Sequence, residues 1–102
     1  MIEVDDLRID TVGHRVTRGD TPIELSTKEF GVLVALASRA GQVVTKQTLY
    51  DEVWGFDQDH RSNVVEVFIR YLRAKVDEPF GVKTIQTVRG AGYRLALPGE
   101  AS

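Results

Sequence analysis

The sequence lacks cysteine altogether, and its 102 residues include one tryptophan, one methionine and three prolines. Without cysteine there is no disulfide, no thiolate ligand for zinc and no cysteine nucleophile. No apolar run approaches the roughly 20 residues of a membrane-spanning helix, and no secretory-signal pattern opens the chain. We therefore expect one globular domain without a membrane partner over residues 1–97, followed by a flexible tail at 98–102.

Basic residues are fewer than acidic ones over the whole chain, but they are unevenly distributed. The formal net charge is −2 and the sequence pI is about 5.6, whereas DNA-binding domains usually have a pI above about 9. Residues 1–59 carry six basic and eleven acidic side chains, but residues 60–94 carry seven basic and three acidic ones. Such an asymmetry is typical of a face that binds a polyanion, and a dipolar protein without such a partner is the alternative.

The first half of the chain predicts short strands followed by two helices. Apolar and polar residues alternate over 2–4, 7–10, 15–17 and 23–25, with turn residues between them, as in an antiparallel sheet with one buried face. Ser26 and Glu29 then form a capping-box pattern that begins a helix, and Gly41 provides its stop. A second helix is expected from Thr45 to Trp54.

A third helix is predicted at about 62–77, followed by a hairpin at 83–97. At about 100° per residue, Val65, Ile69, Leu72 and Val76 form one apolar stripe. The opposite face carries Asn63, Glu66, Val67, Arg70, Arg73 and Ala74. The segments 83–88 and 93–97 alternate around a turn at 89–92, as expected for a hairpin.

This order of elements predicts an α+β fold of the winged helix-turn-helix type, with a four-stranded antiparallel sheet, three helices and a C-terminal β-hairpin wing. In that arrangement the third helix enters the DNA major groove and the wing lies at the adjacent minor groove. Arg70 and Asn63 would present hydrogen bonds to base edges, and Val67 would contact a thymine methyl. The alternative is that the arginines simply solvate an exposed helix face.

The wing turn contains two glycines, Gly90 and Gly92, separated by Ala91. A dinucleotide fingerprint is rejected, since the third glycine is missing and a strand follows instead of a helix. The glycines would allow positive φ angles and close approach to a phosphate or groove, and Arg89 would enter a minor groove. A tight turn without a ligand is the alternative.

Other candidate sites give weaker signals. Trp54 would either contact a DNA phosphate through its indole N–H or close the end of the core, and the residue taken alone favours the core. His60 lies near Asp57 and Asp59, which suggests either a weak metal site or a polar loop, and we favour the loop. No catalytic motif occurs, so we predict no enzyme activity, no cofactor and no metal.

Four segments carry a resemblance to a known family. They are 25–30 (LSTKEF), 43–49 with 53–55 (VVTKQTL and VWG), 62–75 (SNVVEVFIRYLRAK) and 85–94 (IQTVRGAGYR). Together they resemble the C-terminal DNA-binding domain of OmpR/PhoB-type response regulators, over about residues 2–97. Many members have Arg-Arg where this chain has Arg70-Tyr71, and Tyr71 cannot make a bidentate contact to guanine, so DNA sequence preference does not transfer.

The resemblance implies a role for each matching residue. The residues that would face bases are Asn63, Val64, Val67, Arg70 and Tyr71. Those that would contact the DNA backbone or minor groove are Trp54, Arg61, Ser62, Arg73, Lys75, Thr87, Arg89, Gly90 and Tyr93. The loop that would contact RNA polymerase comprises Gly55, Phe56, Asp57, Gln58, Asp59 and His60.

The resemblance also implies the biological setting. The chain would be the output domain of a cytoplasmic two-component regulator, a monomer in isolation that binds promoter DNA as a tandem pair. A phosphoryl-accepting receiver domain would belong upstream, and nothing like it is present in these residues. A rival function is a winged-helix protein-interaction module whose basic face meets an acidic protein.

Overall fold

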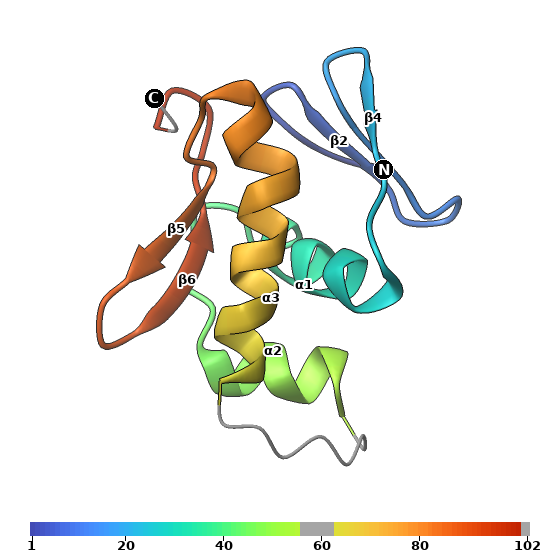
Figure 1. Cartoon of the computed structure of the whole chain (residues 1–102). Helices are drawn as coiled ribbons and strands as arrows, with labels where there is room; N and C mark the ends of the chain where they lie inside the picture. The colour runs from blue at the N-terminus through green and yellow to red at the C-terminus, as the bar shows by residue number, and fades with distance from the viewer. Residues whose placement is uncertain (56–62, 101–102) are drawn as a thin grey trace.

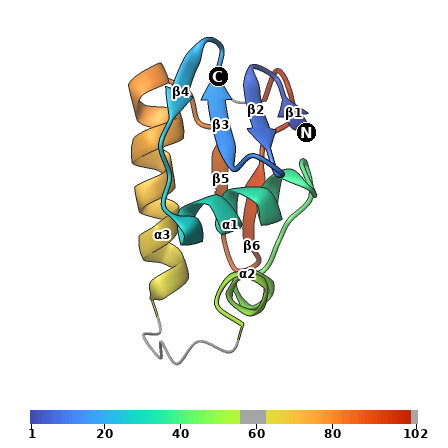
Figure 2. The same cartoon turned by 90° about the vertical axis from the view of Figure 1, so that its right-hand side faces the viewer.

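The computed structural model of the chain describes residues 1–55 and 63–100. A four-stranded sheet lies at one end, α1 (Thr27–Ala37) packs beneath it, and α2 (Lys46–Val53) lies at the opposite end (Figures 1 and 2). The third helix, α3 (Val64–Leu72), runs between these ends, with the C-terminal hairpin along one side (Figure 1). None of the helices in the described part of the chain has the length and apolar character needed to cross a membrane.

The N-terminal sheet has the order β1-β2-β3-β4, and every pair is antiparallel. Its strands are β1 (Ile2–Val4), β2 (Leu7–Asp10), β3 (Arg15–Arg18) and β4 (Thr21–Ile23). The predicted alternation is confirmed in β2, where Leu7 and Ile9 are fully buried. The fourth strand begins two residues earlier than predicted, because Pro22, which lacks an N–H, occupies an edge strand opposite Thr17.

The first two helices begin at the predicted caps. Helix α1 (Thr27–Ala37) has Ser26 as its N-cap: the Glu29 N–H donates to Ser26 Oγ (3.2 Å), and the Ser26 N–H donates to Glu29 Oε1 (2.8 Å). Helix α2 (Lys46–Val53) is capped by Thr45. Helix α1 ends at Ala37, before Gly41; the Gly41 N–H instead donates to Leu95 of the hairpin (2.8 Å).

Helix α3 (Val64–Leu72) continues into a wider π-type turn over Arg73–Asp77 and a 3₁₀ turn over Glu78–Phe80. The α-helix therefore begins at Val64, and the helical segment runs past the predicted end at Asp77 and is not a regular α-helix throughout. The predicted apolar stripe is confirmed: Val65, Ile69, Leu72 and Val76 are each at most 5% exposed. Burying this stripe against α1 leaves the opposite face of α3 outermost.

The hairpin consists of β5 (Ile85–Val88) and β6 (Gly92–Leu95). Val44 acts as a third partner: its N–H donates to the Tyr93 carbonyl (2.7 Å), and its carbonyl accepts from the Tyr93 N–H (2.9 Å). Gly92 has φ +151°, and a Cβ there would lie 2.2 Å from the Val44 carbonyl oxygen. Backbone packing thus requires glycine at position 92. For this residue the structure favours the alternative of a tight turn without a ligand.

The segment predicted as a flexible tail makes contacts up to its last described residue. Glu100 Oε1 accepts hydrogen bonds from the Leu97 N–H (2.7 Å) and from Arg94 Nη2 (3.0 Å). The Gln86 side chain donates to the Glu100 carbonyl (3.3 Å). Residues 98–100 therefore fold back onto the hairpin, and the flexibility of the tail stays a prediction.

Candidate nucleic-acid interface

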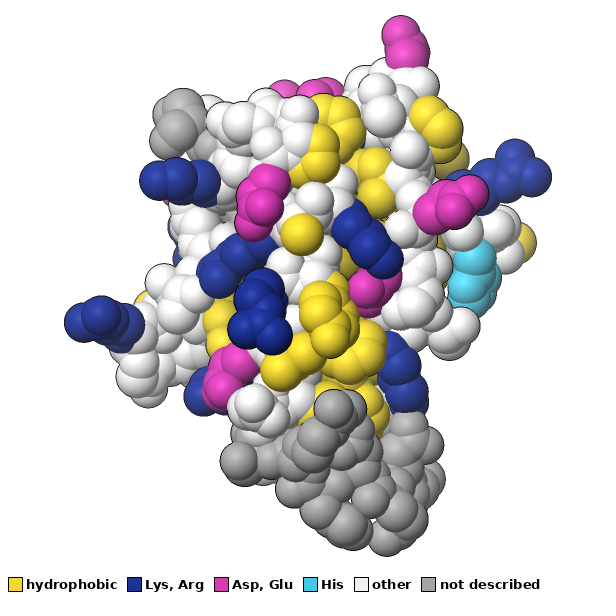
Figure 3. Space-filling model, in the orientation of Figure 1, with side chains coloured by type: hydrophobic (Ala, Val, Ile, Leu, Met, Phe, Trp, Pro, Cys, Tyr) yellow, Lys and Arg dark blue, Asp and Glu magenta, His cyan; other side chains and the backbone are white. Residues whose placement is uncertain are grey.

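The outer face of α3 presents three of the five side chains predicted to read bases. Asn63 and Arg70 are exposed, and Val67 is half-buried. Arg70 makes no hydrogen bond or ion pair with any residue that the structure describes, so its guanidinium is available to a ligand. Figure 3 views this side of the molecule and shows Lys and Arg side chains over the hairpin and the adjacent part of α3.

Arg73 connects this face to the wing. Its Nε donates to the Ile85 carbonyl (3.0 Å), and its Nη2 donates to Thr87 Oγ1 (2.6 Å). Arg73 and Thr87 were predicted to contact the DNA backbone separately, and the structure joins them into one cross-link. This cross-link fixes the spacing between the helix and the hairpin, which a duplex would contact together.

The tip of the wing is open on all sides. Arg89, Gly90 and Ala91 are exposed, and Gly90 has φ +74° with nothing within 4 Å of the position of a Cβ. Glycine at position 90 serves the turn conformation, while Arg89 projects its charge from the end of the hairpin. This geometry suits insertion of a single arginine into a narrow groove.

A hollow of about 460 Å³ lies between α3, the start of α2 and the wing. The side chains of Lys46 and Glu66 line it and form a close ion pair, and the Glu66 carboxylate raises the pKa of Lys46. Tyr93, predicted to contact the DNA backbone, is 5% exposed and lines the same hollow. Burial, reinforced by Glu66, raises the pKa of the Tyr93 phenol, which stays protonated.

The other shoulder of α3 packs against α2 through aromatic rings. Trp54 stacks on Tyr50 with ring centroids 5.9 Å apart and meets Phe68 edge-on at 5.2 Å. Trp54 is 4% exposed, which favours the core alternative, and its contact with a DNA phosphate stays a prediction. Tyr71, packed edge-on against Phe68 and 44% exposed, keeps surface for a ligand.

The expectation that Val64 faces a base is wrong. Its side chain is 2% exposed and belongs to the hydrophobic core. Val64 lies on the same shoulder of the helix as Tyr71, about 100° or more from Arg70 in rotation around the axis. At the first turn of α3 this shoulder is covered, so no apolar surface of Val64 remains for a base.

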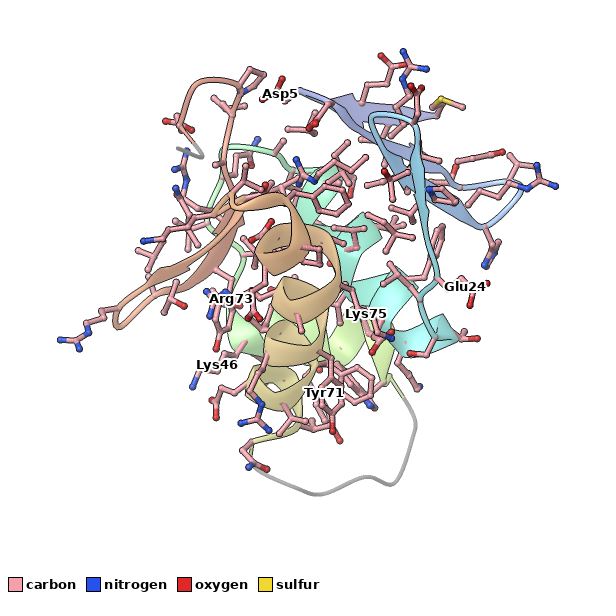
Figure 4. All side chains as sticks on the ribbon, turned by 45° about the horizontal axis from the view of Figure 1, so that its top comes forward. Asp5, Glu24, Lys46, Tyr71, Arg73 and Lys75 are labelled. Atoms are coloured by element: carbon pink, nitrogen blue, oxygen red, sulfur yellow. The ribbon has the colours of Figure 1, made fainter. Side chains whose placement is uncertain are left out.

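Lys75 has a structural partner within the protein. Its Nζ bonds to Glu29 Oε1 at 2.7 Å, and the Glu29 side chain is 6% exposed. Burial alone would raise the pKa of Glu29, but Lys75 and Ser26 together hold that pKa below its ordinary value. Figure 4 shows Lys75 on the α1 side of α3, away from Lys46 and Arg73 on the wing side. The Lys75 side chain is still 43% exposed, so its predicted phosphate contact stays a prediction.

Several predicted residues lie outside the described part of the chain. They are Arg61 and Ser62 of the DNA-backbone set, and Phe56, Asp57, Gln58, Asp59 and His60 of the polymerase loop. Gly55, which precedes them, is exposed and has φ +50°. Among the described residues, no cluster of three or more potential ligands could hold a metal ion.

Sequence reasoning missed Lys46 and Glu66. The helix periodicity placed Glu66 on the outer face beside Arg70, which was the available signal. Lys46 gave no signal, because its approach to Glu66 depends on how α2 crosses α3. The pairing of the two residues beside the wing comes from the structure alone.

Known proteins similar to this chain are transcriptional regulators. Residues 20–95 match the family model described as "Transcriptional regulatory protein, C terminal". The chain is 52% identical to the transcriptional regulatory protein TcrA of Mycobacterium tuberculosis over 98 residues, covering 96% of this chain and 39% of TcrA. It is 48% identical to HprR of Escherichia coli over 92 residues, covering 90% of this chain and 41% of HprR. The chain thus spans about two-fifths of the length of these relatives.

Solved structures show the same fold, in one of the two cases below in a complex with DNA. The DNA-binding domain of Klebsiella pneumoniae RstA bound to the RstA box superposes with a TM-score of 0.81 at 35% identity, covering 93% of this chain and 95% of that one. The DNA-binding domain of E. coli CpxR gives a TM-score of 0.81 at 31% identity, covering 94% and 95% of the two chains. The predicted winged-helix fold is confirmed, and the chain belongs to the family of OmpR/PhoB-type C-terminal DNA-binding domains of transcriptional regulatory proteins.

Proposed function

We propose that this chain binds double-stranded promoter DNA sequence-specifically, as the output domain of a two-component response regulator. The observation that carries the proposal is the outer face of α3, where Arg70 is exposed and unpaired among the described residues, beside a wing that ends in Arg89. Base edges in the major groove would be read by Asn63, Val67, Arg70 and Tyr71. The minor groove would receive Arg89.

Affinity and specificity come from different parts of this surface. Contacts to phosphate supply sequence-independent affinity that falls with salt, whereas hydrogen bonds to base edges discriminate between sequences. The Arg73–Thr87 cross-link would hold α3 and the wing at the separation of adjacent grooves. A net charge of −2 predicts weak nonspecific binding, so we infer that two copies bind tandem half-sites about one helical turn apart.

The remaining partners follow from the family. We propose that the isolated chain is a monomer, that a receiver domain controls it in a longer regulator, and that the segment 55–60 contacts RNA polymerase. The setting is the cytoplasm, where promoter DNA is located. No enzyme activity and no cofactor are proposed.

A titration with two polyanions tests this function against the rival protein-interaction module. Duplexes are first selected from a random pool with the purified chain, and a selected duplex is then compared with heparin by fluorescence anisotropy. We expect the selected duplex to bind at least tenfold more tightly at about 0.15 M salt. Equal, weak binding to both polymers would favour the rival function.

A further inference from the structure

An acidic side chain stands on the face proposed to enter the major groove. Glu66 precedes Arg70 by four residues and Arg73 by seven, so the three side chains lie along one face of the helix. The Glu66 side chain is 41% exposed, and its carboxylate is paired with the Lys46 ammonium, whose side chain is 57% exposed. Neither residue has a part in the proposed contacts described above.

The position of this ion pair would bring it close to a phosphate strand and to base edges when DNA binds. Lys46 and Glu66 line the hollow between α3 and the wing, and Figure 4 shows Lys46 on the same side of α3 as Arg73. A duplex that contacts both α3 and the wing would bring a phosphate strand over this hollow and base edges over Glu66. The phosphates attract Lys46 and repel Glu66.

A carboxylate covered by DNA needs a hydrogen-bond donor, because an ionised group removed from water without a partner is strongly unfavourable. In the major groove, donors are the exocyclic amino groups of cytosine (N4) and adenine (N6). Guanine and thymine present acceptors at the corresponding edge. Adenine also has the N7 acceptor beside its amino group. This nitrogen would face the second carboxylate oxygen, so two acceptors would oppose each other, which favours cytosine.

We propose that Glu66 is a specificity-determining residue that accepts a hydrogen bond from the N4 amino group of a cytosine while Lys46 moves from Glu66 to a backbone phosphate. This inference rests on the proposed function and adds one base position to it. The exchange is coupled: the cytosine amino group takes the place of the ammonium at Glu66, and the released ammonium adds a phosphate contact. Where the base offers an acceptor, Lys46 stays paired with Glu66, and both the hydrogen bond to the base and the phosphate contact are lost.

The experiment compares selections from one random duplex pool by the wild-type chain, Glu66→Ala and Glu66→Gln. The wild type should prefer cytosine at one position by roughly 5- to 100-fold, and Glu66→Ala should abolish that preference and leave the other positions intact. Glu66→Gln should shift it toward adenine, because an amide pairs with both N6 and N7. Thermal melts of both variants establish that they are folded.

The matched control is Glu52→Gln, which breaks another exposed ion pair, between Glu52 Oε2 and Arg39 Nη2 at 2.7 Å, outside the hollow. It should select the same sequences as the wild type. Identical sequences selected by Glu66→Ala and the wild type would overturn the inference. A wild-type pool without any enrichment would overturn the proposed function itself, and the inference with it.

The exchange of Lys46 has a separate readout. On the selected site, Lys46→Ala should reduce the slope of log K against log salt by up to about one. On a site with guanine in place of that cytosine, the same variant should leave the slope unchanged. An unchanged slope on both sites would show that Lys46 never reaches a phosphate, which overturns the exchange.

Discussion

At the scale of single residues, the account depends on which charged side chains are already engaged within the protein. Arg73 is held by Ile85 and Thr87, and Lys75 is held by Glu29. Arg70 and Arg89 have no such partner among the described residues. Basic side chains close together in the sequence are therefore expected to have different roles. Single substitutions should distinguish those that stabilise the fold from those that contact DNA.

Arg70→Ala should narrow the difference in affinity between a selected duplex and random DNA. Loss of an arginine contact to a base edge costs about 1–3 kcal/mol of discrimination, whereas nonspecific binding rests on phosphates and changes less. Competition binding with both kinds of duplex measures the ratio. Discrimination equal to that of the wild type would remove Arg70 from the base-reading set.

Arg89→Ala should lower the salt slope of DNA binding by up to about one unit, because a cation near DNA displaces condensed counterions. Lys75→Ala is the matched control. The resemblance assigns Lys75 to the DNA backbone, whereas its ion pair with the buried Glu29 favours an unchanged slope, and this variant decides between the two. Equal reductions of the salt slope by Arg89→Ala and Lys75→Ala would contradict the distinction between an unpaired Arg89 and an ion-paired Lys75.

The helix periodicity predicted most of this arrangement. Rotation about α3 placed Arg70 outward and put Lys75 on the shoulder with Tyr71, where the structure has it. It could not predict that this shoulder is covered at Val64 or that Lys46 reaches Glu66. Both depend on how other segments pack against α3, and no periodicity within a single helix contains that information.

At the scale of elements, the start of α1 is fastened to the end of the third helical segment by Glu29. This one carboxylate completes the capping box with Ser26 and accepts the Lys75 ammonium. The sequence pattern predicts the first role, because the capping box is local. It does not predict the second, because Lys75 lies 46 positions further along the chain. Strand boundaries show the same limit at β4, where pairing with β3 overrides the turn character of Pro22.

Glu29→Gln should destabilise the fold by about 1 kcal/mol at pH 7, because the amide keeps the cap geometry but loses the charge that Lys75 binds. The folded-state pKa of Glu29 lies below its ordinary value of 4.5. Its contribution is therefore present above pH 4.5 and is lost as the pH falls through the folded-state pKa.

Urea unfolding at a series of pH values measures this effect. The difference in unfolding free energy between the wild type and Glu29→Gln should shrink as the pH falls below 4.5. Lys75→Met should show the same pH-dependent loss. A difference that stays constant with pH would mean that the charge of Glu29 does not stabilise the fold.

At the scale of the whole molecule, Arg18 joins the N-terminal sheet to the base of the wing. It is 4% exposed. Its Nη1 donates to Asp6 (2.7 Å), and its Nη2 donates to Thr84 Oγ1 (2.8 Å) and lies 3.7 Å from Asp77 Oδ1. Asp77 in turn accepts the Ile85 N–H at 3.0 Å. These partners come from both ends of the chain, so no local sequence pattern predicts the cluster.

Arg18→Met should destabilise the fold by about 3–5 kcal/mol, because it leaves the buried Asp77 carboxylate without a cation. Adding Asp77→Asn should restore part of the loss, since the amide keeps an acceptor for Ile85 and removes the charge. Urea unfolding of the single and double variants measures the coupling. Strictly additive effects would show that the two side chains do not interact.

The most direct test of the central claim is a map of the amide signals that shift when the ¹⁵N-labelled chain is titrated with a selected duplex. The account predicts that the shifts concentrate on residues 63–74 and on the wing turn 87–91, with strands β1 to β4 little changed. Shifts concentrated on the N-terminal sheet, with α3 and the wing unaffected, would contradict it.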